Sequence, residues 1–182
     1  MRPLQYIIGG WWSDLFPEVW LRGPVNGIPG MLQPVAHALM QCVEELTAVL
    51  AVLTPAQIWA RPADVASVGF HVRHAAGSLD RLFTYARGEQ LSAAQRAALA
   101  AEGEADPAPD AGARLLAGFT GAVDRALEQL RATDAATLLE PRGVGRAQLP
   151  STVLGLLFHA AEHTQRHTGQ AVTTAKVVID PM

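Results

Sequence analysis

The sequence predicts an all-α protein, a four-helix bundle with one or two short extra helices. Three observations lead to this fold class. Four long segments repeat apolar residues at three- and four-residue steps, loops rich in Gly and Pro separate them, and no segment alternates apolar and polar residues as a half-buried strand does. At 182 residues and 49% hydrophobic content, the chain can form one domain with a substantial core. We expect residues 1–30 to be an N-terminal extension and entry loop, and residues 31–182 to be the bundle domain.

The first half of the chain predicts two long helices joined by a short one. Apolar residues recur at helical spacing over about 31–53, after a loop dense in helix breakers. Thr54 and Pro55 are typical of the N-cap and first position of a short helix, which Pro62 ends. Ser67 is the expected cap of the second long helix, which ends near Arg87 because Gly88 follows.

The second half predicts a short helix followed by two long ones. Residues 92–102 are rich in Ala and form the short helix, and prolines in the segment after them indicate a loop. A third long helix is predicted over about 111–132. A break at 141–150 precedes the fourth, which begins near Ser151 and Thr152 and ends near Val177.

Composition excludes several classes of function. The net charge is −3 and the 14 Lys and Arg are dispersed, which argues against a nucleic-acid surface. The chain has no run of about 18 apolar residues, so we expect a soluble protein with no membrane role. The single cysteine, Cys42, rules out an internal disulfide and suits the cytoplasm. Because it lies on the apolar stripe of the first helix, we expect a packed thiol.

Five of the six histidines lie in two clusters. His159, His163 and His167 are spaced i, i+4 and i+8, whereas His71 and His74 are three residues apart. Histidines at i and i+4 on a helix lie about 6 Å apart along its axis, so both can reach one metal ion. The first and last of the three lie about 12 Å apart, too far for bonds of roughly 2.1 Å to one ion. Geometry therefore allows either overlapping pair.

A third ligand is expected from the second long helix. His71 or His74 is the obvious donor, because a catalytic zinc-type site generally has three protein ligands and an open position. Three neutral imidazoles suit Zn, Ni, Cu or Fe, and the ligand type does not choose among them. His37 stands alone in the sequence, and we interpret it as structural.

Two other metal motifs fit this chain poorly. The segment from His159 to His163 has the H-x-x-E-H pattern of inverzincin proteases, but no glutamate follows to act as the third ligand. A di-iron bundle requires Glu-x-x-His motifs, whereas Glu162 is followed three residues later by Gln165. We therefore interpret Glu162 as a solvated residue or as one that orients a ligand imidazole.

Two segments resemble the DinB/YfiT-like family of bacterial proteins. They are the run from Val68 to Tyr85, with its His-Ala-Ala-x-Ser-Leu-Asp-Arg, and the H-x-x-x-H-Thr-Gly-Gln that begins at His163. The resemblance covers roughly residues 30–178 and implies a DinB-type four-helix bundle, often dimeric. It also implies a divalent metal ion such as Ni or Zn, held by His74, His163 and His167. The additional histidines His71 and His159 leave open whether one of them replaces a member of this triad.

The resemblance also implies a class of reaction. Relatives in the wider superfamily are metal-dependent transferases or isomerases that use low-molecular-weight thiols such as mycothiol or bacillithiol. We therefore expect a small-molecule substrate, a thiol cosubstrate and a homodimer, with a metal-dependent hydrolase as another possible enzyme class. Asp80, Arg81, Tyr85 and Arg166 are candidates for assisting at the mouth of the site. The alternatives are a metal-binding stress-response protein without turnover and a purely structural bundle.

Overall fold

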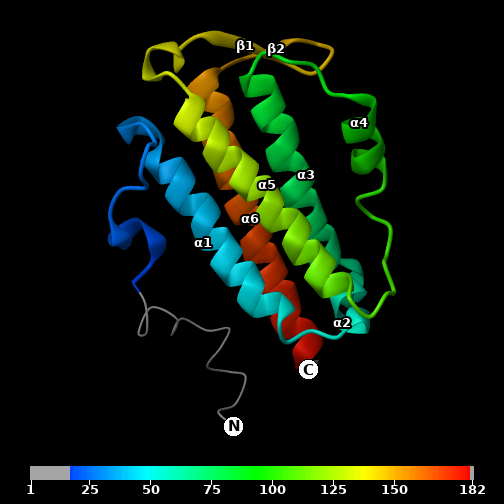
Figure 1. The fold of residues 1–182 in the computed structure, drawn as a ribbon. Helices are drawn as coiled ribbons and strands as arrows, with labels where there is room; N and C mark the ends of the chain where they lie inside the picture. Colours follow the sequence, from blue (N-terminus) through cyan, green and yellow to red (C-terminus); the bar gives the residue numbers. More distant parts are fainter. Residues whose placement is uncertain (1–16, 181–182) are drawn as a thin grey trace.

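The computed structural model describes residues 17–180, and they are mostly helical. Four long helices lie side by side: α1 (Gln33–Leu50), α3 (Val68–Ala86), α5 (Ala111–Ala132) and α6 (Val153–Ile179) (Figure 1). α1 and α3 each pack against both α5 and α6, and the contact between α3 and α6 is the most extensive. This contact brings together the two helices that carry the histidine clusters.

Short helices connect and flank the four long ones. Two are α-helical, α2 (Pro55–Trp59) and α4 (Ala93–Ala100). The 3-10 helices are η3 (Val19–Arg22), η4 (Gly30–Leu32), η5 (Pro62–Asp64) and η6 (Ala135–Thr137). α4 ends two residues before Glu102, which the sequence had placed inside a helix, so this residue lies in the turn that follows.

Hydroxyl side chains begin several of these helices. The side chains of Thr54, Ser67, Ser92 and Thr152 each accept a hydrogen bond from a backbone N–H of the first turn. Such caps satisfy donors that have no partner within the helix. Gly88 follows the end of α3 with a φ of +79°, a conformation that glycine adopts without strain. The capping residues expected from the sequence at Thr54 and Ser67 are thus confirmed.

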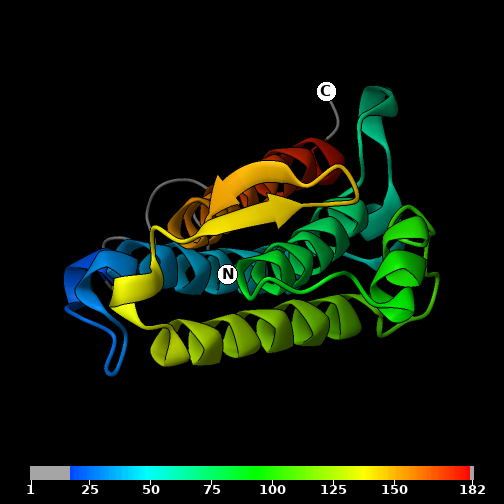
Figure 2. The ribbon, with the colours of Figure 1, turned by 90° about the horizontal axis from the view of Figure 1, so that it is seen from above.

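A small antiparallel hairpin departs from the expected all-α class. It consists of β1 (Pro141–Val144) and β2 (Leu149–Thr152), with Pro141 opposite Thr152. The two strands cross the end of the helices where α3 ends and α6 begins (Figure 2). The prediction of a simple break was wrong here, because a proline in each strand and a length of four residues remove the alternating pattern that reveals longer strands.

The core fills the space between the four long helices. Its largest fully buried side chains come from every long helix and from α2 and η4; they include Leu32, Leu39, Leu46, Ile58, Leu79, Phe119, Leu130 and Leu157. Cys42 belongs to the same core with an exposure of 1%, and burial raises the pKa of its thiol to about 12. The expected packed thiol is confirmed.

The described part of the expected N-terminal extension lies against α1. The Gln33 side chain accepts a hydrogen bond from the Val25 amide and donates to the Ile28 carbonyl, and Arg22 pairs with Glu44. Residues 1–16 of that extension lie outside the described residues. No helix within 17–180 is both long and apolar enough to cross a membrane.

Candidate metal centre

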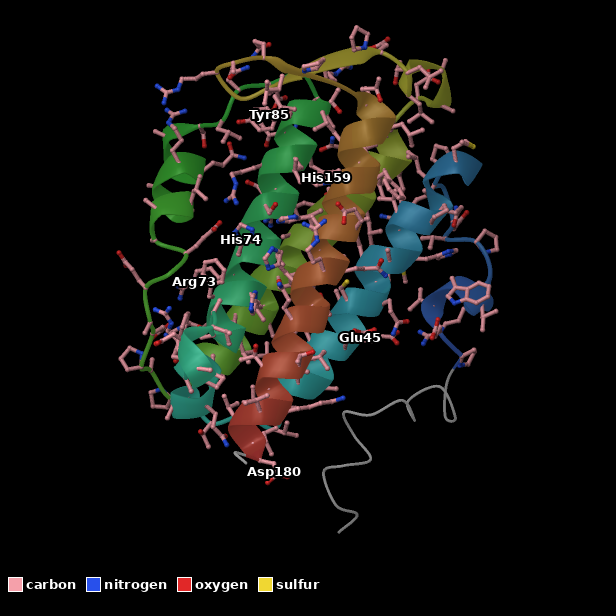
Figure 3. All side chains as sticks on the ribbon, turned by 180° about the vertical axis from the view of Figure 1, so that it is seen from behind. Glu45, Arg73, His74, Tyr85, His159 and Asp180 are labelled. Carbon is pink, nitrogen blue, oxygen red and sulfur yellow. The ribbon has the colours of Figure 1, made fainter. Side chains whose placement is uncertain are left out.

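Three histidines from two helices converge in one cluster. His74 comes from α3, and His163 and His167 come from α6; one nitrogen of each lies within 4.8 Å of the others. His74 Nε2 and His163 Nε2 lie 3.0 Å apart. Figure 3 shows His74 where α3 faces α6, whereas His159 lies further along α6 toward the hairpin. The structure therefore brings together the set that the family resemblance implied.

Small side chains allow the two helices to bring these rings together. Ala75, Ala160 and Thr164 lie next to the histidines or one turn away, and all three are fully buried. Helices pack closer when the residues at their contact are small. Each imidazole can then reach from its own helix toward the other without spreading the two apart.

Glu102 adjoins the cluster, and nothing in the sequence indicated that it would. Its Oε2 accepts a hydrogen bond from His74 Nδ1 at 2.7 Å, and its Oε1 accepts one from Arg81 Nη1 at 2.6 Å. Burial opposes ionisation, but the hydrogen bonds from His74 and Arg81 outweigh it, and the pKa of this carboxyl lies below its ordinary value. A lone glutamate after an alanine-rich helix carries no motif, so only the packing of its turn against α3 could reveal it.

The two additional histidines have different surroundings. His71 is buried, and its Nδ1 lies 3.0 Å from Nδ1 of His167. The side chain of His159 is 49% exposed and pairs through Nδ1 with Glu162 at 2.8 Å. Neither belongs to the group of three whose nitrogens converge. His37 contacts the Gly23 carbonyl through Nε2 at 3.0 Å, in keeping with a structural role.

The surroundings of His163 and His167 favour the neutral form of their imidazoles. Burial, followed by the nearby imidazoles His74, His163 and His71, lowers the pKa of His167 to about 4. Burial and the neighbouring His74 lower the pKa of His163 in the same direction. Metal ions bind the neutral form of histidine, so a lowered pKa keeps the ligand form available at neutral pH.

The arrangement of nitrogen atoms fits a metal ion. Because the Glu102 carboxylate only accepts, His74 carries its hydrogen on Nδ1 and directs the Nε2 lone pair at His163. His163 Nδ1 is buried with no hydrogen-bond partner among the described residues. If the His163 hydrogen is on Nε2, the Nδ1 lone pair stays unpaired; if it is on Nδ1, two lone pairs face each other. A cation between the Nε2 atoms relieves the second case, and tetrahedral zinc places two ligand nitrogens about 3.4 Å apart.

Three other polar residues that were candidates for assisting at the mouth of the site are paired with side chains outside the histidine triad. Arg81 is buried against Glu102, and the carboxylate of Asp80 accepts a hydrogen bond from Gln95 at 2.7 Å. Arg166 is exposed and pairs with Glu162 at 2.8 Å. A groove of about 290 Å³ runs between α1 and α6, but its lining includes none of the three converging histidines.

Comparison with known proteins agrees with this geometry. A family model described as the DinB superfamily matches residues 38–171. The chain belongs to the DinB superfamily. The matched segment contains all three converging histidines and also Glu102, so the candidate centre lies entirely within the DinB domain. No curated protein matches the chain.

Proposed function

We propose that this DinB superfamily protein is a divalent-metal-dependent enzyme that joins a low-molecular-weight thiol to a small electrophilic substrate, as an S-transferase or isomerase. One observation carries the proposal: His74, His163 and His167 present one nitrogen each to a common point. Three neutral imidazoles suit Zn or Ni, the two ions that we favour, and three protein ligands leave a coordination position for a reactant.

The residues of the chain supply orientation and charge. When bound, the metal ion would lower the pKa of a thiol or water in the open position and so favour the anion at neutral pH. His74, His163 and His167 are neutral ligands, so they leave the charge of the ion uncompensated. Arg166 lies near His163 and His167, but its charge is paired with that of Glu162 at 2.8 Å.

An aromatic ring forms one side of the cluster. The ring of Phe70 stacks on that of His74, with centroids 5.4 Å apart and an angle of 11° between the planes. Phe70 is half-buried, so it provides an apolar contact beside the ligand nitrogen. This contact supports a substrate with an apolar part next to its electrophilic atom.

The proposed S-transfer needs no reactant other than the thiol and the electrophilic substrate. The thiol gives its proton to solvent, its sulfur forms a C–S bond with the electrophilic carbon, and the leaving group departs with the electron pair of the bond that breaks. In an isomerisation the same sulfur adds to an activated double bond, the C–C bond rotates, and the sulfur leaves again. Neither path requires an oxidant or a protein nucleophile.

Metal content tests the first part of the proposal. Protein purified without a histidine tag is loaded with Zn²⁺ or Ni²⁺, desalted and measured by elemental analysis, together with His74→Ala, His163→Ala and His167→Ala. We expect about one ion per wild-type chain and loss of stoichiometric binding in each variant. His159→Ala is the matched control and retains the ion, since its ring is exposed and pairs with Glu162. Full occupancy in all the triad variants would contradict the proposed site.

Thiol turnover tests the second part. Metal-loaded protein is mixed with mycothiol or bacillithiol and monochlorobimane, whose C–Cl bond breaks as the fluorescent thioether forms. We expect thioether to form faster than with the metal-free protein or with His163→Ala. A metal-loaded protein that shows no turnover with either thiol would favour metal binding without catalysis, and the metal site would remain.

A further inference from the structure

Glu102 is a buried carboxylate with both oxygens in use. It is 4% exposed, although it comes from a turn between α4 and α5 rather than from a core helix. One oxygen faces His74 Nδ1 and the other faces Arg81, so neither is directed at the point where the three histidines converge. Its position is that of a partner to a ligand rather than of a ligand.

The surface of helix α3 leaves space for this carboxylate at Gly77. Gly77 lies between His74 and Arg81 on the same face of the helix, one turn from each. A Cβ atom at this position would lie 2.5 Å from Glu102 Oε1 and 2.7 Å from Arg81 Nη1, closer than non-bonded atoms approach. Glycine weakens a helix interior relative to alanine, and here the carboxylate occupies the space that its missing side chain leaves.

The backbone around Glu102 is also attached to α3. The Arg73 guanidinium donates hydrogen bonds to the carbonyls of Ala101 and Glu104, on either side of Glu102. The same guanidinium stacks over the ring of Trp59, 4.7 Å from its centroid. Two arginine side chains of α3 therefore hold this turn: Arg73 binds the backbone of the turn, and Arg81 binds the Glu102 carboxylate.

We propose that Glu102 is a positioning residue for the metal centre: it fixes the hydrogen of His74 on Nδ1, so that Nε2 is held as a ligand facing His163 and His167. This inference rests on the proposed metal site. Arg81 completes the device, because it occupies Oε1 and prevents the carboxylate from turning toward the ion itself. The hydrogen bonds from Arg81 and His74 to Glu102 thus connect the metal centre to a turn that lies outside the four long helices.

The substitution Glu102→Gln tests this role without changing the shape of the side chain. Arg81 can only donate, so the amide oxygen of the glutamine faces Arg81 and its NH₂ group faces His74. His74 Nδ1 must then accept, which moves the ring hydrogen to Nε2, the atom that faces His163. The proposal therefore predicts a reversed tautomer as well as weaker metal binding. In Arg81→Met/Glu102→Gln the amide is free to turn, and we expect partial recovery of both properties.

The experiment measures tautomer and affinity separately in the full chain. Long-range ¹H–¹⁵N NMR of the metal-free protein reports which nitrogen of His74 is protonated, and competition with a chromogenic chelator gives the Zn²⁺ dissociation constant. In Glu102→Gln we expect the hydrogen on Nε2 and affinity about 10- to 100-fold lower. Glu104→Gln is the matched control: it removes a charge from the same turn, its side chain is exposed, and both readouts stay at wild-type values.

A second variant keeps the test decisive if Glu102→Gln does not fold. Gly77→Ala changes no polar group and favours the helix, but its Cβ displaces Glu102. We expect weaker Zn²⁺ binding from a protein at least as helical as the wild type. Wild-type affinity in either folded variant, or an unchanged His74 tautomer in Glu102→Gln, would overturn the inference. If the wild type binds no metal, the proposed function fails while the tautomer measurement still tests the role of Glu102.

Discussion

His71 and His167 face each other across α3 and α6, with their Nδ1 atoms 3.0 Å apart. Two ring nitrogens at this distance share one hydrogen, so one ring donates and the other accepts. If His167 binds a metal through Nε2, its own Nδ1 carries the hydrogen and His71 is the acceptor. Removing this acceptor with His71→Leu should lower Zn²⁺ affinity about tenfold, as for other partners of metal-bound histidines.

The control for this prediction is His159→Leu, which removes an exposed histidine of α6, one turn before His163 in the sequence. Its Zn²⁺ affinity should equal that of the wild type, measured by the same chelator competition. If His71→Leu abolishes stoichiometric binding as completely as His167→Ala does, His71 is itself a ligand and the assignment of the triad is wrong.

Acid should destabilise the metal-free protein. The pKa of His167 is about 4 in the folded chain, whereas an unfolded histidine has about 6.5. Between these two pH values the unfolded chain binds more protons than the folded chain. The free energy of unfolding is therefore highest above pH 6.5 and falls as the pH drops toward 4. Urea unfolding with a chelator present, repeated from pH 7.5 to pH 4, measures this slope. His167→Gln should flatten it, and an equally steep slope in that variant would assign the acid sensitivity to other groups.

The buried cysteine should be unreactive in the folded protein. Cys42 is buried in the core and the pKa of its thiol is about 12, so almost no thiolate forms at neutral pH. We expect Ellman's reagent to label it only after denaturation, and Cys42→Ala to keep wild-type metal content and thiol turnover. Rapid labelling of the native protein, or loss of turnover in Cys42→Ala, would make the thiol a participant in the chemistry.

The core should depend strongly on Phe119. This side chain of α5 is 0% exposed, and its removal leaves a large cavity among the helices. Phe119→Ala is expected to lower the free energy of unfolding by about 3–5 kcal/mol, measured by urea denaturation. Leu99→Ala, at a residue that is 43% exposed, should change it by less than about 0.5 kcal/mol. Equal effects of the two substitutions would contradict the burial of Phe119.

The sequence was sufficient to predict the helices because each carries its own local signals. Apolar periodicity located the four long ones, and Ser67, Thr54 and Gly88 marked ends that the structure confirms. The hairpin at 141–152 was missed because its strands are four residues long and each contains a proline, so no alternating pattern marks them. Its contacts with the helices, such as the hydrogen bond from the Arg142 side chain to the carbonyl of Ala86, are not visible in the sequence. Short strands of this kind depend on contacts that no local pattern records.

The sequence by itself determined that histidines on two helices could meet, since spacing of three and four residues fixes rings on one helical face. Only the tertiary structure decided which of them meet. The burial of residues such as Leu157, Ala160 and Thr164 sets the rotation of α6, which turns His163 and His167 toward α3. His159 lies one turn nearer the hairpin and remains exposed (Figure 3). Binding of a metal by His74, His163 and His167 stays a prediction. The contact between Glu102 and His74, 28 residues apart, could not be predicted from the sequence. Glu102 lies in an irregular turn, and the packing of such a turn, unlike that of a helical face, leaves no periodic pattern.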